Sequence, residues 1–192
     1  MRLLQDRGYE VHAAACPADG HKEEVEAAGV TCWDIPFARS PYGLGNINAC
    51  RKLGRLLRKC RYHLIHVHTP VASFIGRFLA KATGQRPVLY TAHGFHFYRG
   101  APIKDWLLYY TAERLAARWT DGFIVMNGKD YENAQKMGFV PAKNLFLVHG
   151  VGVDLRRYNI RDFDHLAFKA RFWLGSNDVV VTCVAELNHN KN

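Results

Sequence analysis

The sequence predicts an α/β fold, a doubly wound parallel sheet, and three observations support this prediction. Strand-like and helix-like segments alternate along most of the 192 residues. The strand-like segments are short and rich in Val, Ile, Leu and Phe, which is typical of parallel strands covered on both faces. Hydrophobic residues make up 48% of the chain and charged residues 22%, the balance of a soluble globular protein.

The first part of the chain begins this alternation. The opening residues read as the last turns of a helix, followed by strands at 10–16, 30–36 and 63–68 and by helices at 21–29 and 47–61. Gly29 marks the C-terminal cap of the first of these helices. The second helix follows a loop that contains Pro, Gly and Asn, residues that interrupt regular structure.

The rest of the chain continues the pattern. Helices are predicted at 71–84, 103–119, 129–138 and 161–175, and strands at 87–92, 121–126, 144–149 and 178–187. Gly84 ends the first of these helices and Pro102 precedes the second, where each residue type is favoured. The last predicted strand would begin a further β-α unit, of which only a loop follows.

The formal net charge of +9 is concentrated in one predicted helix. Its basic residues flank an apolar stripe and are Arg51, Lys52, Arg55, Arg58, Lys59 and Arg61. The helix could present a solvated face, contact an anionic membrane surface, or bind nucleic acid. The chain has no zinc-finger spacing and no aromatic RNA-binding motif, so we expect no nucleic-acid partner.

Two further features bear on the compartment. No apolar stretch approaches the roughly 20 residues that cross a bilayer, and the N-terminus has no signal-peptide pattern. The five cysteines are scattered without a C-x-x-C pair, which predicts reduced thiols. We therefore expect a cytoplasmic protein, peripheral at the inner face of the plasma membrane if the basic helix Arg51 to Arg61 binds lipid.

Polar or glycine-rich segments follow four consecutive predicted strands. In an open parallel sheet, ligands bind beyond the carboxyl ends of the strands. The residues delivered there are His66, His68 and Thr69, then His93 and Gly94, then Asn127 and Gly128, and finally Gly150, Gly152 and Asp154. We expect His93 to lie at the mouth of a ligand cleft, beside a glycine that lets a ligand approach the backbone.

These histidines do not by themselves predict a metal site. Zinc needs three or four converging ligands, and neither an H-E-x-x-H helix nor a cysteine pair occurs here. A nucleophile elbow, a Walker loop and a dinucleotide fingerprint are also missing from the sequence. The residues alone therefore predict a polar, histidine-bearing cleft without a metal or cofactor, and they do not name a reaction.

Four stretches together resemble one family of enzymes: "HVHTPVASFIGRFLAK", "PVLYTAHGFHFYRGAP", "ERLAARWTDGFIVMNGKDYENAQ" and "VHGVGVDLRRY". They are similar to the N-terminal half of retaining glycosyltransferases of the GT-B fold, above all the bacterial exopolysaccharide and capsular transferases. The segment "VVVTCVAELNHNKN" looks like the first strand and loop of the second lobe. The resemblance implies an acceptor-side Rossmann-like lobe at 1–154, a linker and helix at 155–177, and the start of a nucleotide-sugar-binding lobe at 178–192.

The resemblance also implies roles for individual residues. His93 matches the family histidine that bonds the donor sugar and stabilises charge, so it is the catalytic candidate. Lys191 matches a lysine that contacts the donor diphosphate, whereas Glu186 stands where an arginine is usual. Asp154 matches only a linker residue. The substrate-binding candidates are His68, Thr69, Gly94, His96, Asn127 and Gly150.

The family's first strand would precede Met1, and most of its second lobe would follow Asn192. We therefore expect a gap in the sheet, into which 178–187 could pair within the chain or swapped between two chains. The implied reaction moves a hexose from a nucleotide-sugar to a saccharide or lipid-linked acceptor for cell-surface polysaccharide. The chain alone is expected to be inactive. The alternative is a non-catalytic or split-enzyme module that needs a separate donor-binding lobe.

Overall fold

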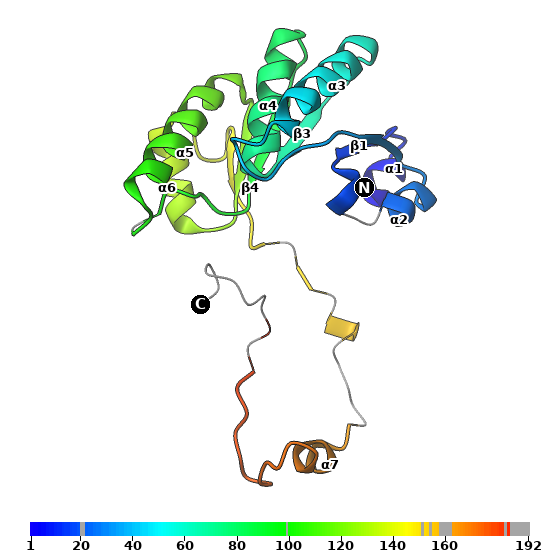
Figure 1. Cartoon of the computed structure of the whole chain (residues 1–192), viewed down its shortest axis with the longest axis vertical. Coiled ribbons are helices and arrows are strands. Elements are labelled where there is room, and N and C mark those ends of the chain that lie inside the picture. Colours follow the sequence, from blue (N-terminus) through cyan, green and yellow to red (C-terminus); the bar gives the residue numbers. More distant parts are fainter. Residues whose placement is uncertain are drawn as a thin grey trace. The chain divides into compact units, whose positions relative to one another are not determined.

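The structure is a computed structural model of the whole chain. It describes residues 1–19, 22–98, 100–150, 152–153, 155–157, 163–182 and 184. The chain divides into two compact units, Met1–Gly150 and Val151–Asn192. In Figure 1 the first unit runs from blue to yellow.

The described strands of the first unit form two parallel sheets. The strands are β1 (His12–Ala15), β2 (Thr31–Asp34), β3 (Ile65–His68), β4 (Val88–Ala92), β5 (Gly122–Val125) and β6 (Leu145–Leu147). One sheet has the order β1-β2 and the other the order β3-β4-β5-β6. The predicted parallel α/β architecture is therefore confirmed, and each of these strands lies inside its predicted segment.

The helices between the strands also lie where the sequence predicts them. They are α1 (Arg2–Gln5), α2 (Lys22–Ala27), α3 (Gly45–Lys59), α4 (Pro70–Ala82), α5 (Ile103–Ala116) and α6 (Gly128–Lys136), with short 3-10 turns at Pro17–Asp19 and Ala117–Trp119. Pro70 occupies the first turn of α4, where its missing N–H costs nothing. The predicted helix 103–119 thus tightens into a 3-10 turn for its last residues.

The sheet is interrupted between β1 and β3. In the described part of the chain, β1 pairs with β2 alone and β3 with β4 alone, so each has a free edge. The two edges border a common cavity of about 690 Å³, which is also lined by Leu53, Leu56 and Leu57 of α3. In the described residues the interruption leaves backbone polar groups of both edge strands without a sheet partner, and the strand expected before Met1 stays a prediction.

The two sheets are nevertheless tied together within the first unit. His12 Nδ1 of β1 lies 2.9 Å from the Tyr62 hydroxyl, just before β3. The Trp33 indole of β2 donates to the same His12 nitrogen at 3.3 Å. Burial raises the pKa of Tyr62 to about 12, so its hydroxyl stays protonated at neutral pH. The β1-β2 sheet is thus held beside β3 by side chains rather than by a backbone ladder.

Helix α3 is amphipathic, and its apolar side belongs to the core. Leu53, Leu56 and Leu57 pack in a cluster with Ile75 and Leu79 of α4. Its basic residues, in contrast, are exposed. The apolar stripe is therefore not available for insertion into a membrane, and any contact of this helix with lipid would be electrostatic.

A second cluster packs one face of the four-stranded sheet. It contains Tyr90 of β4, Phe123 of β5 and Leu145 of β6, with Ala134 of α6 among its buried members. The rings of Tyr90 and Phe123 stack with centroids 4.9 Å apart. The side chains of alternate residues, including Thr91, point to the opposite face. That opposite face carries the polar residues considered below.

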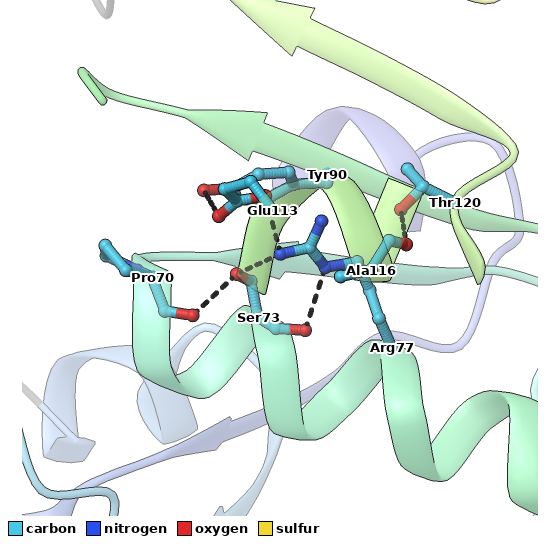
Figure 2. A network of polar contacts seen from close by, with 7 residues as sticks. All are labelled: Pro70, Ser73, Arg77, Tyr90, Glu113, Ala116 and Thr120. Atoms are coloured by element: carbon cyan, nitrogen blue, oxygen red, sulfur yellow. Dashed lines mark hydrogen bonds and ion pairs between the residues drawn. The ribbon is translucent and has the colours of Figure 1, made fainter. Parts of the chain in front are cut away.

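A buried ion pair joins α4, β4 and α5 on the packed face (Figure 2). Arg77, only 1% exposed, places Nη2 2.9 Å from Glu113 Oε2 and donates to both the carbonyl and the hydroxyl of Ser73. Its guanidinium also lies 4.1 Å from the centroid of the Tyr90 ring. The Tyr90 hydroxyl donates to Glu113 Oε1 at 3.1 Å. This network ties the Tyr90 side chain of β4 to α4 and α5.

The second unit contains a 3-10 turn, Leu155–Arg157, and one short helix, α7 (His165–Ala170). Asp164 caps α7, because its Oδ1 accepts the Ala167 N–H at 2.9 Å. The predicted helix 161–175 is therefore shorter than expected. Lys169 Nζ donates to the carbonyls of Ser176 and Asp178, at 2.9 and 2.7 Å.

The predicted strand at 178–187 is not present in its described residues, 178–182 and 184. Val179, Val181 and Val184 are 90%, 91% and 94% exposed. A strand needs a neighbouring edge for its backbone hydrogen bonds, and no other strand occurs in the described part of this unit. The predicted strand is therefore wrong for these described residues, and the possible pairing of 178–187 into the gap, within the chain or swapped between two chains, stays a prediction.

Candidate functional site

The carboxyl ends of β3 and β4 bring the predicted polar residues together. The strands are parallel, with His66 opposite Leu89 and His68 opposite Thr91. His66 and His68 lie on one face as the strand alternation predicts, with ring centroids 4.3 Å apart. His66 Nε2 is 2.8 Å from the Thr91 hydroxyl, which anchors the first imidazole to the neighbouring strand.

His93 follows β4 directly and turns toward β3. Its Nε2 lies 3.1 Å from His68 Nδ1, and the two ring centroids are 5.4 Å apart. Both side chains are exposed. The predicted catalytic candidate is therefore at the sheet rim and accessible, in a row of three imidazoles that begins at His66.

Two imidazoles of this row, His66 and His68, have lowered pKa values. Partial burial of the ring, followed by the neighbouring rings of His66 and His93, lowers the pKa of His68 to about 4. The pKa of His66 is lowered by burial first and by His93 second. His68 and His66 are consequently neutral at pH 7, and each can donate one hydrogen bond and accept another.

The backbone on both sides of the row adopts unusual conformations. Thr69, the N-cap of α4, has φ +59° and ψ 150°, a conformation that residues other than glycine rarely adopt. Gly94 has φ +148°, which only glycine adopts without strain. Strained residues of this kind occur preferentially at functional sites, where surrounding structure holds them in place.

An anchor that the sequence analysis missed holds the loop after His93. Asp130, in the first turn of α6, accepts the Phe95 N–H at 3.1 Å and the Asn127 amide at 2.8 Å through Oδ2. Its own N–H donates to Asn127 Oδ1 at 2.8 Å. The spacing Asn-x-x-Asp at a predicted helix start was the available signal, because it is typical of reciprocal capping.

The other predicted substrate-binding residues differ in whether they lie at the cavity near the histidines. His68, Thr69 and His96 line the cavity between β1 and β3, and the His96 ring lies 4.7 Å from that of Tyr109. The Asn127 side chain caps α6 and so reaches the His93 loop only through Asp130. Gly150, with φ +83°, ends the first unit, and no contact between described residues joins it to the histidines. Lys191, Glu186 and Asp154 lie outside the described residues.

Two other kinds of feature, a metal site and a membrane-spanning helix, do not occur in the described residues. No group of three or more His, Cys, Asp or Glu side chains could hold a metal ion there. Within the same residues, no helix is both long enough and apolar enough to cross a membrane. The imidazoles of this rim can donate and accept hydrogen bonds, and His66 and His68 also line the cavity.

Comparison with known proteins identifies the family. Residues 1–150 match the glycosyl transferase 4-like domain. The chain belongs to this family. It is a family of glycosyltransferases of the GT-B type, as the sequence resemblance predicts.

Two relatives support the assignment. The chain is 34% identical over 195 residues to EpsD of Bacillus subtilis (strain 168), whose name places it among glycosyltransferases. It is 30% identical over 159 residues to the Escherichia coli UDP-Gal:alpha-D-GlcNAc-diphosphoundecaprenol alpha-1,3-galactosyltransferase. These matches cover 100% and 82% of this chain but only 50% and 41% of the relatives. The chain thus spans about half the length of the relatives that it matches.

Proposed function

We propose that the chain is the acceptor-side lobe of a retaining glycosyltransferase that builds cell-surface polysaccharide. The donor is a nucleotide-sugar, and the acceptor is a saccharide or a lipid-linked saccharide. The observation that carries this proposal is the exposed His93 at the rim of a sheet in a glycosyl transferase 4-like domain. The E. coli relative, whose name includes a diphosphoundecaprenol-linked GlcNAc, supports a lipid-linked acceptor.

In this reaction the bond between the anomeric carbon and the diphosphate oxygen breaks, and the acceptor hydroxyl forms the new bond on the same face. The hydroxyl proton leaves with the diphosphate. His93 donates a hydrogen bond to the donor sugar and stabilises the charge that develops as the bond breaks. Lys191 neutralises charge on the diphosphate. The enzyme needs no metal or other cofactor for these roles.

The second lobe is needed to hold the donor against the acceptor, because positioning both reactants supplies much of the rate. The purified chain should therefore transfer no sugar from UDP-galactose to a short-chain prenyl-diphosphate GlcNAc. The assay is chromatography of the radiolabelled lipid product. Efficient turnover by wild-type chain that disappears in His93→Ala would contradict the need for a second lobe and keep the role of His93.

A split-enzyme module, to which a separate chain supplies the donor-binding lobe, is the second candidate. Adding a separately purified donor-binding half of the B. subtilis relative should then restore transfer. Transfer that is restored only with wild-type chain, and not with His93→Ala, would support the split enzyme. Failure to restore transfer at saturating concentrations of both halves would remove this candidate.

We also propose that the protein is cytoplasmic and peripheral at the inner face of the plasma membrane. The exposed cations of α3, including Arg51, Arg55 and Arg58, would contact anionic lipid, each contributing about 1 kcal/mol near the surface. Sedimentation with vesicles containing phosphatidylserine should exceed that with neutral vesicles and should fall in Arg51→Glu/Arg55→Glu. Equal sedimentation with both vesicle types would contradict an electrostatic contact.

A further inference from the structure

The row of imidazoles at the rim has an order that goes beyond the role of His93. Reading from β4 toward the ligand side, the Thr91 hydroxyl contacts His66, the His66 ring lies against His68, and His68 bonds His93. We propose that His68 is a positioning residue, whose hydrogen bond fixes the orientation of the His93 ring and the tautomer that it presents to a ligand. This inference rests on the proposed function, in which His93 touches the donor sugar.

The geometry assigns the two nitrogens of His93 to different tasks. Nε2 is engaged by His68 Nδ1 at 3.1 Å, which leaves Nδ1 as the nitrogen for a ligand. When His68 donates into Nε2, the proton of neutral His93 must lie on Nδ1, because a neutral imidazole carries one proton. His93 then offers a hydrogen-bond donor to the sugar. Without His68, the two tautomers of an exposed imidazole would interconvert freely.

The neutrality of His68 lets it serve His93 in both of its protonation states. Because the pKa of His68 is lowered to about 4, its ring carries no charge at pH 7 and has one N–H and one lone pair. His68 Nδ1 can donate a hydrogen bond to Nε2 of a neutral His93. After a ring flip or a tautomer shift, His68 can instead accept a hydrogen bond from a protonated His93. The groups that act on His68 are His66 from its own strand and His93 from the loop after β4.

The backbone conformations next to both histidines support the view that the contact between His68 and His93 positions the His93 ring. His68 is followed by Thr69 at φ +59°, and His93 is followed by Gly94 at φ +148°. The loop after His93 is tied to α6 through the bond from Phe95 N–H to Asp130. His68 is thus held at the end of β3, and His93 lies in a loop that is tied to α6, so a single bond between them can set the ring of His93.

The test uses the whole chain labelled with ¹⁵N-histidine and long-range ¹H–¹⁵N correlation spectra of the ring nitrogens. His68→Asn places an amide near the position of the imidazole Nδ1 and keeps the hydrogen bond. His68→Phe keeps a ring without the nitrogen. We expect one fixed tautomer of His93 in wild type and His68→Asn, and in His68→Phe nitrogen shifts that move toward the average of the two tautomers.

His68→Gln is the second polar variant, in case His68→Phe does not fold. Its amide lies one carbon farther out, so it should behave like His68→Phe, while circular dichroism confirms the fold. His12, which bonds Tyr62, is the internal control and should not change. Unchanged His93 shifts in folded His68→Phe or His68→Gln, or averaged shifts already in wild type, would overturn the proposal.

The experiment separates this inference from the proposed function, because no sugar is present. If UDP-galactose and the acceptor lipid later fail to shift His93 while His68→Phe still averages its tautomers, the proposed function fails and the positioning stands. If the ligands shift His93 equally in wild type and His68→Phe, with the same tautomer in both, the positioning role fails and the sugar site stands.

Discussion

Asp121 links the starts of two neighbouring strands through one carboxylate. Its Oδ1 accepts from the Arg86 guanidinium, with Nε at 2.9 Å, and its Oδ2 accepts the Val88 N–H at 2.7 Å. Burial would raise the pKa of Asp121, but the hydrogen bonds from Arg86 and Val88 outweigh it and lower the pKa. The ionised carboxylate is therefore favoured by folding.

This lowered pKa predicts a specific pH dependence of stability. The unfolded chain binds more protons than the folded chain at and below the ordinary carboxyl pKa of about 3.9, so the contribution of Asp121 is lost as pH falls. Asp121→Asn, which still accepts from Val88, should lower the free energy of unfolding at pH 7 and flatten its decline below pH 5. Urea unfolding at several pH values measures this. An acid decline as steep as in wild type would contradict the prediction.

Residue-scale prediction succeeded where one strong rule applied. Strand alternation alone predicts that His66 and His68 share one face, and the rule that ligands bind at the carboxyl ends of strands places His93 at the same rim. The role of Asp130 was not predicted from the sequence. Its carboxylate accepts the Phe95 N–H, and this contact depends on how the loop after β4 packs against α6. The hydrogen bond between His66 and Thr91 likewise depends on strand register, which sequence pattern does not define.

The helices and strands of the first unit were predictable because Gly or Pro residues mark many of their ends and because their hydrophobic residues recur with the spacing of a helix or a strand. The predicted strand at 178–187 was not, since its pattern reports the tendency of valines to form strands but not whether an edge is available. In the described residues of its unit no such edge exists. Hydrogen exchange of Val179 to Thr182 should therefore be close to that of an unstructured peptide. Strong protection that increases with protein concentration would instead support the swapped pairing between two chains.

The ion pair between α4 and α5 makes a sharper prediction for stability. Arg77→Met would leave Glu113 buried without its cation, which typically costs about 3–5 kcal/mol. The double variant Arg77→Met/Glu113→Leu removes both charges and should recover much of that loss. Denaturant unfolding of wild type, both single variants and the double variant measures the coupling.

The comparison of the single variants with the double variant decides whether Arg77 and Glu113 are energetically coupled. Strictly additive losses, or a loss below about 1 kcal/mol for Arg77→Met, would show that Glu113 finds solvent or another partner. Thr91 and His93 lie outside the network, so the spectra of the rim histidines should change little in the double variant. A large change there would show that the network also sets the geometry of the rim.

At the scale of the whole molecule, the fold and family were accessible from sequence, and the sugar was not. The α/β class follows from the alternation of strands and helices, and the glycosyltransferase family from longer stretches such as "TAHGFHFYRGAP". The identity of sugar, nucleotide and acceptor depends on side chains that surround a bound ligand from two lobes. This chain covers about half the length of its relatives, so those contacts cannot be derived from it.

The central claim is that His93 faces a saccharide at the rim of the sheet. Titration of the ¹⁵N-histidine-labelled chain with UDP-galactose, in the presence of a water-soluble, short-chain prenyl-diphosphate GlcNAc, tests it most directly. The account predicts saturable shifts of the ring signals of His93, His68 and His96, with His12 unchanged. Shifts confined to His12, or none at His93 when binding is independently shown to be saturated, would contradict it.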